Sequence, residues 1–180
     1  KLFIVKKDPS LTKEQVLDLP PKLYATQTCE MTDEQSLAYW KMAEELVAML
    51  GEEDDDRTET ASNQLVAMMR LTQITSGWVK DAEGRVYRFP KNPKLDLLEE
   101  LVRETPRGSA GIIWARYRED VAVIAARLAD LRPSVIQGGM SDDETDAAQD
   151  RFLDGTTDWL IGNPKAGGAG LNLQRASQAF

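Results

Sequence analysis

The sequence has no histidine and a single cysteine, Cys29. These shortages exclude an internal disulfide and leave too few ligands for a zinc site or a histidine-based catalytic triad. A lone cysteine is typical of a reducing compartment. No apolar run approaches the roughly 20 residues that a membrane-spanning helix needs, and the opening apolar stretch is too short for a signal peptide. We therefore expect no disulfide, no membrane partner and no metal site.

The length and the charge limit what the chain can be. With 180 residues and 42% hydrophobic content, it can bury one core of ordinary size and carry a small appendage. It opens at Lys1 rather than methionine, so we expect a piece of a longer polypeptide. The net charge of −8 does not favour nucleic-acid binding. Much of the acid falls in two blocks, however, at residues 52–59 and 142–158, which leaves a local DNA-binding edge open.

The first half of the chain predicts a linker, a strand, two helices and a hairpin. Residues 1–21 end in Leu19-Pro-Pro21 and are typical of a tether. The Thr- and Tyr-rich segment 22–30 predicts a strand. A capping box at 32–35 predicts a helix to Gly51, an acidic solvated loop follows, and a second helix covers 62–76. A hairpin is expected over 78–89, turning at 81–84. In the first helix the apolar positions recur at helical spacing: Leu37, Trp40, Ala43, Leu46, Val47 and Leu50. The second has a wide apolar face, with two methionines expected to fill a core: Leu65, Met68, Met69, Leu71 and Ile74.

From residue 93 onward the pattern alternates between helix and strand. Helices are predicted over 93–104, 118–131 and 141–153, and strands over 111–115, 134–137 and 158–162. This alternation is typical of an α/β fold, a parallel sheet with helices on both faces. In such sheets ligands bind at the carboxyl ends of strands. The loops that follow the three strands are therefore the candidate functional segments.

The third of these loops, residues 163–174, has three glycines within four residues. Glycines directly after a strand let the backbone approach a ligand and present amide N–H groups to an anion. The P-loop spacing fails because no Gly-Lys-Ser/Thr follows, and the dinucleotide fingerprint fails because its third glycine position is Leu173. A simple connecting turn remains an alternative.

The loop also carries a family resemblance. Lys165-Ala-Gly-Gly-Ala-Gly-Leu-Asn-Leu173 resembles motif V of the Swi/Snf-type helicase-like ATPases, which are superfamily two DNA translocases. Gly111–Ala115 is similar to the motif IV strand of that family, and Met69–Thr75 is similar to its Leu-Arg-Gln-Ile-Cys helix. Further similar segments follow the family's order and cover nearly all of the chain: 19–22, 31–35, 92–96, 137–141 and 151–152.

The resemblance implies a RecA-like C-terminal lobe that stops before motif VI. Residues 1–21 would be the interlobe linker, 22–92 an entry strand with a helical and hairpin appendage, and 93–180 the partial lobe. The chain departs from the family at Thr145, where an arginine is usual, and at Asn163 and Pro164, where Ser or Thr is usual. Motif VI with its arginine finger would lie beyond Phe180, and the Walker A lysine and the Asp-Glu motif belong to the first lobe.

By resemblance, the chain is part of a DNA-dependent ATPase that translocates on duplex DNA. The N-terminal lobe of the same polypeptide would hold the ATP phosphates and Mg²⁺, so no catalytic residue or metal ligand is expected in this chain, and the chain alone is predicted to be inactive. Gly170 and Asn172 would approach the nucleotide, through a backbone amide and a side-chain amide. The residues implied to face the DNA backbone are Lys165, Ala166, Gly167, Gly168, Trp114, Ala115, Arg116, Gly138 and Gly139.

Each of these assignments has an alternative. Asn172 can cap a following helix, Arg116 and Arg118 can be ordinary surface charges, Trp114 can be a core aromatic, and Gly138-Gly139 can be only a turn. The whole chain can instead be the lobe of an RNA helicase or a non-catalytic RecA-like module for protein interaction. The absence of eukaryotic-style insertions favours a cytoplasmic protein of bacterial or phage origin; a eukaryotic source would place it in the nucleus.

Overall fold

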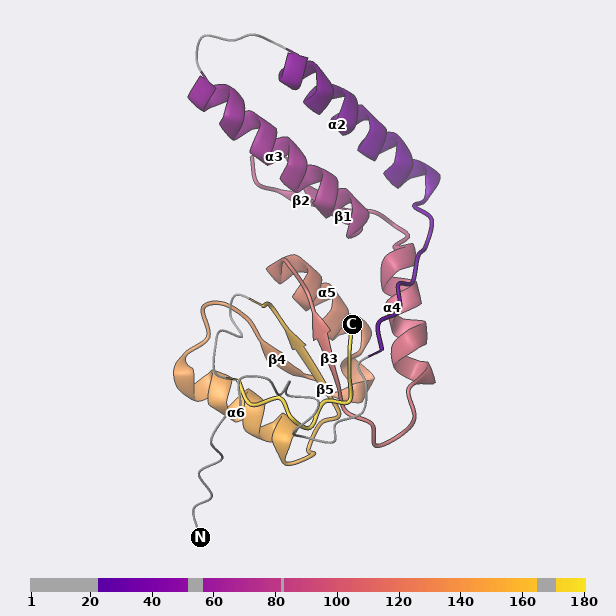
Figure 1. Cartoon of the computed structure of the whole chain (residues 1–180), viewed down its shortest axis with the longest axis vertical. Helices are drawn as coiled ribbons and strands as arrows, with labels where there is room; N and C mark the ends of the chain where they lie inside the picture. The colour runs from indigo at the N-terminus through magenta and orange to yellow at the C-terminus, as the bar shows by residue number, and fades with distance from the viewer. Residues whose placement is uncertain (1–22, 52–56, 82, 165–170) are drawn as a thin grey trace, which may run out of the picture.

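The computed structural model describes residues 23–51, 57–81, 83–164 and 171–180 and is shown in Figure 1. A pair of long helices projects from an α/β lobe. The predicted linker at 1–21 and the acidic residues 52–56 lie outside the described residues. The appendage contains α2 (Asp33–Gly51), α3 (Arg57–Thr75), β1 (Trp78–Lys80) and β2 (Val86–Arg88). The lobe contains α4 (Pro93–Glu104), β3 (Gly111–Trp114), α5 (Arg118–Arg127), a 3₁₀ turn (Ala129–Leu131), β4 (Ser134–Ile136), α6 (Asp142–Leu153), β5 (Trp159–Gly162) and β6 (Gln178–Ala179).

The lobe is built on a parallel sheet in the order β4-β5-β3-β6. All three strand pairs are parallel. In the register, Ile161 of β5 lies between Ile113 of β3 and Val135 of β4. Helix α5 connects β3 to β4 and helix α6 connects β4 to β5, which are the crossovers that parallel strands need. The predicted RecA-like α/β fold is therefore confirmed.

Successive residues of the central strands point to opposite faces of the sheet and fill two separate cores. On one face Ile113 and Ile161 pack with Val121 and Leu128 of the α5 region and with residues of α4. On the other face the neighbouring residues of the same strands pack against α6, in the cluster Ala110, Ile112, Ile136, Ala148, Phe152 and Leu160. Both faces are covered, which explains why these strands are short continuous apolar runs.

Three predictions about the elements were wrong. Residues 23–30 are exposed and contain no strand, because Thr and Tyr favour an extended backbone but a strand also needs a neighbouring edge to pair with. The helix predicted over 118–131 ends at Arg127. The 3₁₀ turn Ala129–Leu131 follows, and the next residue, Arg132, has a left-handed φ of 49°. The strand β6 was missed because two residues carry no readable period.

The appendage is a helical hairpin, but the helices bury less than predicted. The capping box is confirmed: the Gln35 backbone N–H donates to Thr32 Oγ1, and the Gln35 amide also donates to the Ile74 carbonyl of α3 at 3.1 Å. Leu46, Ala67 and Ile74 are buried. In contrast Leu37 (74%), Trp40 (63%) and Val47 (68%) are exposed, as are Leu65, Met68 and Met69, because each helix packs along a single narrow stripe of the other. The core-filling role predicted for Met68 and Met69 was therefore wrong, and the Leu50 side chain lies outside the description.

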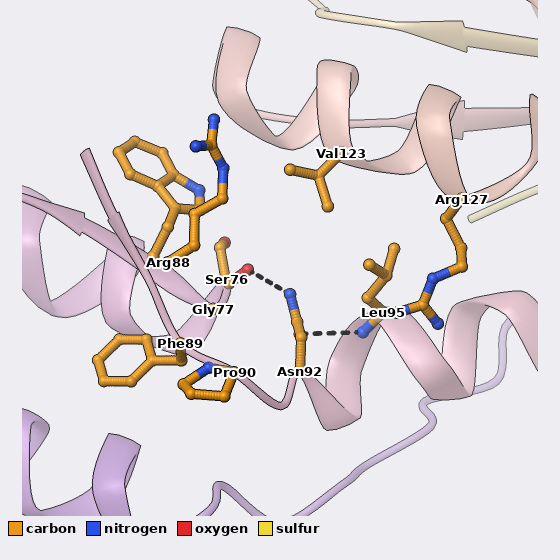
Figure 2. Close-up of a pocket in the computed structure, with 10 residues that line it drawn as sticks. Ser76, Gly77, Arg88, Phe89, Pro90, Asn92, Leu95, Val123 and Arg127 are labelled. Atoms are coloured by element: carbon orange, nitrogen blue, oxygen red, sulfur yellow. Dashed lines mark hydrogen bonds between the residues drawn. The ribbon is translucent and has the colours of Figure 1, made fainter.

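The hairpin strands β1 and β2 and the start of α4 join the appendage to the lobe, as Figure 2 shows. The Asn92 amide donates to the Ser76 carbonyl at 2.9 Å, and Asn92 Oδ1 accepts from the Leu95 backbone at 3.1 Å, which caps α4. Gly77 has φ +91°, and a side chain there would collide with Asn92, so this position requires glycine. A cavity of about 150 Å³ lies at this joint, lined in part by Val123 and Arg127 of α5.

Candidate nucleotide and nucleic-acid interface

The carboxyl ends of three strands meet at one edge of the sheet. Trp114 at the end of β3 is the register partner of Gly162 at the end of β5, and Ile136 at the end of β4 is the partner of Gly162 on the other side. The three loops that were singled out from the sequence therefore leave the sheet side by side. We call this edge, with residues 115–118, 137–140 and 163–164, the carboxyl edge.

Arg116 and Asn163 join the first and third loops. The Asn163 side-chain amide donates to the Arg116 carbonyl at 2.6 Å, while its backbone N–H donates to the Ile136 carbonyl at 3.1 Å. Arg116 is exposed, and its guanidinium carbon lies 5.6 Å from the centre of the Tyr117 ring. Asn163 thus fixes the start of the glycine-rich loop relative to both neighbouring strands and leaves the Arg116 charge at the surface.

Arg118 and the two glycines join the first and second loops. Gly139 has φ +92°, and a Cβ atom there would lie 2.9 Å from Arg118 Nη2; at Gly138 the same separation would be 3.4 Å. The turn is closed by the Met140 N–H, which donates to the Gln137 carbonyl at 3.4 Å. The glycines therefore form a turn that lets the guanidinium of Arg118 lie directly against the backbone.

Trp114 and Ala115 lie mostly within the fold. Trp114 is partly buried and packs on the α6 side of the sheet, where a Cβ at Gly162 would come within 3.0 Å of its ring. Ala115 is buried on the opposite face, and its N–H donates to the Gly162 carbonyl at 2.8 Å. Both residues shape the edge through packing. The groups that this edge exposes to solvent include Arg116, Arg118 and the backbone of residues 138–139.

The glycine-rich loop is described at its two ends. Lys165, Ala166, Gly167, Gly168 and Gly170 lie outside the described residues. On the far side, Leu171 and Leu173 pack against the α6 core. Both ends of the loop are therefore held by the lobe, at Asn163 and at residues 171–173.

Arg175 secures the segment that follows the loop. Its guanidinium donates to the carbonyls of Phe152 at 3.0 Å and Thr157 at 2.7 Å and pairs with Asp158 at 2.5 Å. It also lies over the Phe152 ring, 5.5 Å from the ring centre. Sequence reasoning missed this residue, because its partners are 17 to 23 positions away.

Asn172, the residue predicted to reach the ribose, is exposed. Its Oδ1 accepts a hydrogen bond from the Gln174 backbone at 3.3 Å, so a local turn follows it. Residues 171–180 contain no helix, so Asn172 does not cap one. Its amide N–H₂ group offers the donor chemistry that a ribose hydroxyl needs.

Two other classes of site are absent from the described ranges. No group of three or more histidine, cysteine, aspartate or glutamate side chains is arranged to hold a metal ion there. None of the helices described is both long and apolar enough to cross a membrane.

Comparison with known families gives one match to the lobe. Residues 93–180 match the family model of the helicase conserved C-terminal domain. This segment is similar to a helicase C-terminal domain. The match begins at the first residue of α4 and covers all four strands of the parallel sheet. A search of curated proteins finds no significant match to the chain.

Solved structures share the fold of the helicase C-terminal domain together with its appendage. The C-terminal domain of the Sulfolobus solfataricus SWI2/SNF2 ATPase superposes with a TM-score of 0.66 and 21% identity, over 84% of this chain and 67% of that one. The SWI2/SNF2 ATPase core of the same organism in complex with dsDNA gives 0.67 and 20%, over 93% of this chain and 36% of that one. The C-terminal part of the Fun30 ATPase domain gives 0.65 and 16%, over 89% and 74%.

These matches show that the chain shares the fold of Swi/Snf-type C-terminal lobes. The chain spans about a third of the ATPase core that was solved with DNA. Its α2–α3 appendage lies inside the region of likeness, because the 93% of the chain that is matched extends well beyond residues 93–180.

Much of the acidic charge of the chain belongs to one stretch of sequence. Residues 33–75 hold ten carboxylates and three cationic side chains, so this appendage segment alone carries −7 of the net −8. Within the part of the chain that is described, Arg116 and Arg118 form no ion pair with a carboxylate. The edge therefore carries two arginines without an ion-pair partner among the described residues, although the exposed Asp142, Asp143 and Glu144 follow directly after the 137–140 loop.

Proposed function

We propose that the chain works as the second lobe of an ATP-driven motor that moves along duplex DNA. The observation that carries the proposal is the carboxyl edge: two arginines, a glycine turn and the start of a Lys-Ala-Gly-Gly loop meet where three parallel strands end. Ligands of open α/β sheets bind at this edge. The fold shared with a SWI2/SNF2 ATPase core that was solved with dsDNA supports the choice of duplex DNA.

The groups at this edge suit a phosphate backbone better than base edges. Arginine guanidinium groups and backbone amides are typical phosphate contacts, which fix position without reading sequence. Arg116 and Arg118 would bind phosphates directly, and the 138–139 turn would allow the backbone to approach closely. Lys165 would add a third cation from the glycine-rich loop. Such a surface fits a motor that acts on any sequence.

ATP would bind between this lobe and a first lobe of the same polypeptide. The chain would offer donors and a glycine-rich backbone, at Asn172 and Gly170, and the first lobe would hold Mg²⁺. ATP hydrolysis supplies the free energy for the motion. The part of this chain is to contact the nucleotide from the opposite side and to grip DNA in step with closure of the two lobes.

ATP hydrolysis tests the proposal. We expect the full-length polypeptide to hydrolyse ATP faster with duplex DNA than with single-stranded RNA or without nucleic acid, and the 180-residue chain alone to show no turnover. Arg116→Ala and Arg118→Ala together should raise the duplex concentration for half-maximal stimulation by roughly tenfold, because two phosphate contacts are lost. The basal rate without DNA should stay unchanged.

Arg107→Ala is the matched control. Arg107 is also an exposed arginine, but it precedes β3 and so lies at the other end of the strands. Its loss should leave duplex stimulation unchanged. Stimulation by RNA and not by duplex DNA would instead indicate an RNA helicase lobe, and turnover by the 180-residue chain alone would contradict the two-lobe proposal.

A second candidate is a RecA-like module that only binds other proteins. The exposed apolar side chains of α2 and α3, Trp40 and Val47 among them, favour it. A full-length polypeptide with no ATPase activity under any nucleic-acid condition would select this candidate.

A further inference from the structure

Tyr117 stands between the appendage and the carboxyl edge. It is the residue before α5, and its neighbours in the chain are Arg116 and Arg118, the two arginines of the edge. Its side chain is half-buried. The mechanism proposed above assigns it no part, although it touches both regions of the molecule.

On one side Tyr117 is tied to the appendage. Its hydroxyl lies 2.6 Å from Thr72 Oγ1 of α3, and its ring meets the Trp78 ring edge-on with centres 5.4 Å apart. Asp120 completes the link by accepting from Trp78 Nε1 at 2.6 Å and from the Tyr117 backbone N–H at 3.3 Å. A second tie lies nearby, where Arg88 of β2 pairs with Glu119 at 2.6 Å.

On the other side Tyr117 supports Arg116. The Arg116 guanidinium carbon lies over the Tyr117 ring, 5.6 Å from its centre, within the range of a cation–π contact. The Arg116 carbonyl is held separately by Asn163. The backbone of Arg116 is therefore fixed by the third loop, while its charged end rests on a ring whose hydroxyl is bonded to α3.

We propose that Tyr117 is a positioning residue for Arg116, through which the seating of the α2–α3 appendage on α5 controls a contact with the DNA phosphate. The inference rests on the proposed function, in which Arg116 binds phosphate. It assigns the acidic appendage a role without giving it any contact with DNA. Movement of α3 at Thr72 shifts the ring, and the ring shifts the guanidinium.

Binding of a fluorescent duplex to the full-length polypeptide, measured by anisotropy over a series of salt concentrations, tests this. Arg116→Ala should lower the slope of log affinity against log salt by about 0.9, the value for one phosphate contact. Tyr117→Ala should lower it equally, and adding it to Arg116→Ala should change nothing further. Thermal denaturation should show the same loss of stability from Tyr117→Ala in both backgrounds, since that part is structural.

Two milder variants keep the test sound if Tyr117→Ala does not fold. Tyr117→Phe and Thr72→Val each remove the same hydroxyl bond, so each should weaken duplex binding partially and the pair no more than either alone. Tyr87→Phe is the matched control, because it removes the tyrosine hydroxyl bond to Glu34, which lies within the appendage. It should leave the salt slope unchanged.

The outcomes separate the two proposals. If Tyr117→Ala weakens binding by the same factor with and without Arg116, Tyr117 acts independently and the inference is overturned. If the unchanged protein binds duplex but Arg116→Ala keeps the full slope, the inference is again overturned while the motor proposal stands. Failure of the unchanged protein to bind duplex DNA would reject the motor proposal, and the inference with it.

Discussion

Burial and hydrogen bonding have opposite effects on the pKa of Asp120. Burial raises the pKa of Asp120 above its ordinary value, against the hydrogen bonds from Trp78 and the Tyr117 backbone, which lower it. Because the pKa is higher in the folded than in the unfolded chain, the folded state binds more protons in the window between the two values. Stability therefore falls as pH rises through that window.

Asp120→Asn should remove this dependence. As pH rises from about 4 toward neutrality, the unchanged protein should lose stability relative to the variant, which urea unfolding at a series of pH values would measure. Asp154→Asn is a control of opposite sign: hydrogen bonds to Thr156 hold the pKa of Asp154 below its usual value, so its contribution is lost as pH falls. A parallel pH course for Asp120→Asn and the unchanged protein would contradict the assignment.

For the candidate site residues, the sequence predicted their place in the fold better than the contacts that they make. Arg116, Gly138 and Gly139 were predicted from the resemblance and do lie at the carboxyl edge. The contacts that arrange them were not foreseen. Asn163 reaches Arg116 across 47 positions and Tyr117 reaches Thr72 across 45, and no local period records a pairing of that kind.

At the scale of elements, helices and strands could be predicted from the sequence where several local signals agreed. Helix α6 begins at a full capping box, in which the Glu144 backbone N–H donates to Ser141 Oγ at 3.2 Å and the Ser141 N–H donates to the Glu144 carboxylate at 2.8 Å. The strands β3 and β5 are short apolar runs that only a buried sheet can use. By contrast residues 23–30 had strand propensity but no edge to join, and propensity alone was misleading.

Loss of the α6 cap has a measurable cost. Ser141→Ala leaves the Glu144 N–H without its side-chain acceptor and should lower the free energy of unfolding by about 1 kcal/mol. Denaturant unfolding at neutral pH measures it. Ser141→Asp, which keeps an acceptor, should lose much less. If the alanine and aspartate variants are equally destabilised, the cap is not what Ser141 contributes.

For the whole molecule, the appendage and the lobe differ in how much they bury. Every residue of β5 and most of β3 is buried, whereas α2 buries only Gln35 and Leu46 among its described side chains. Local opening is easiest where few apolar contacts must be broken. We expect the amides of α2 to exchange hydrogen much faster than those of β3 and β5, which exchange mass spectrometry would show. Equal protection throughout would mean that the molecule opens only as one unit.

The boundary between the appendage and the lobe was visible in the sequence as a change of pattern near residue 93. The exposure of the appendage was not visible there. The periodicity of Leu37, Trp40 and Val47 predicts an apolar face and does not say whether anything lies against it. A sequence pattern records how a helix divides its own surface. Whether that surface is covered depends on neighbours that the pattern does not name.

The α2–α3 helical hairpin can pivot as a lever about its base. Helix α3 has 19 residues, and it is bonded to the lobe close to its carboxyl end, at Thr72. At 1.5 Å per residue the helix is about 28 Å long, so a tilt of about 10° at that base swings the far tip through about 5 Å. Conversely, a force applied at the tip would produce a small rotation of the base of the helix, beside Tyr117. If the proposed role of Tyr117 holds, a partner bound at the tip would change the position of Arg116 from a distance of about 28 Å.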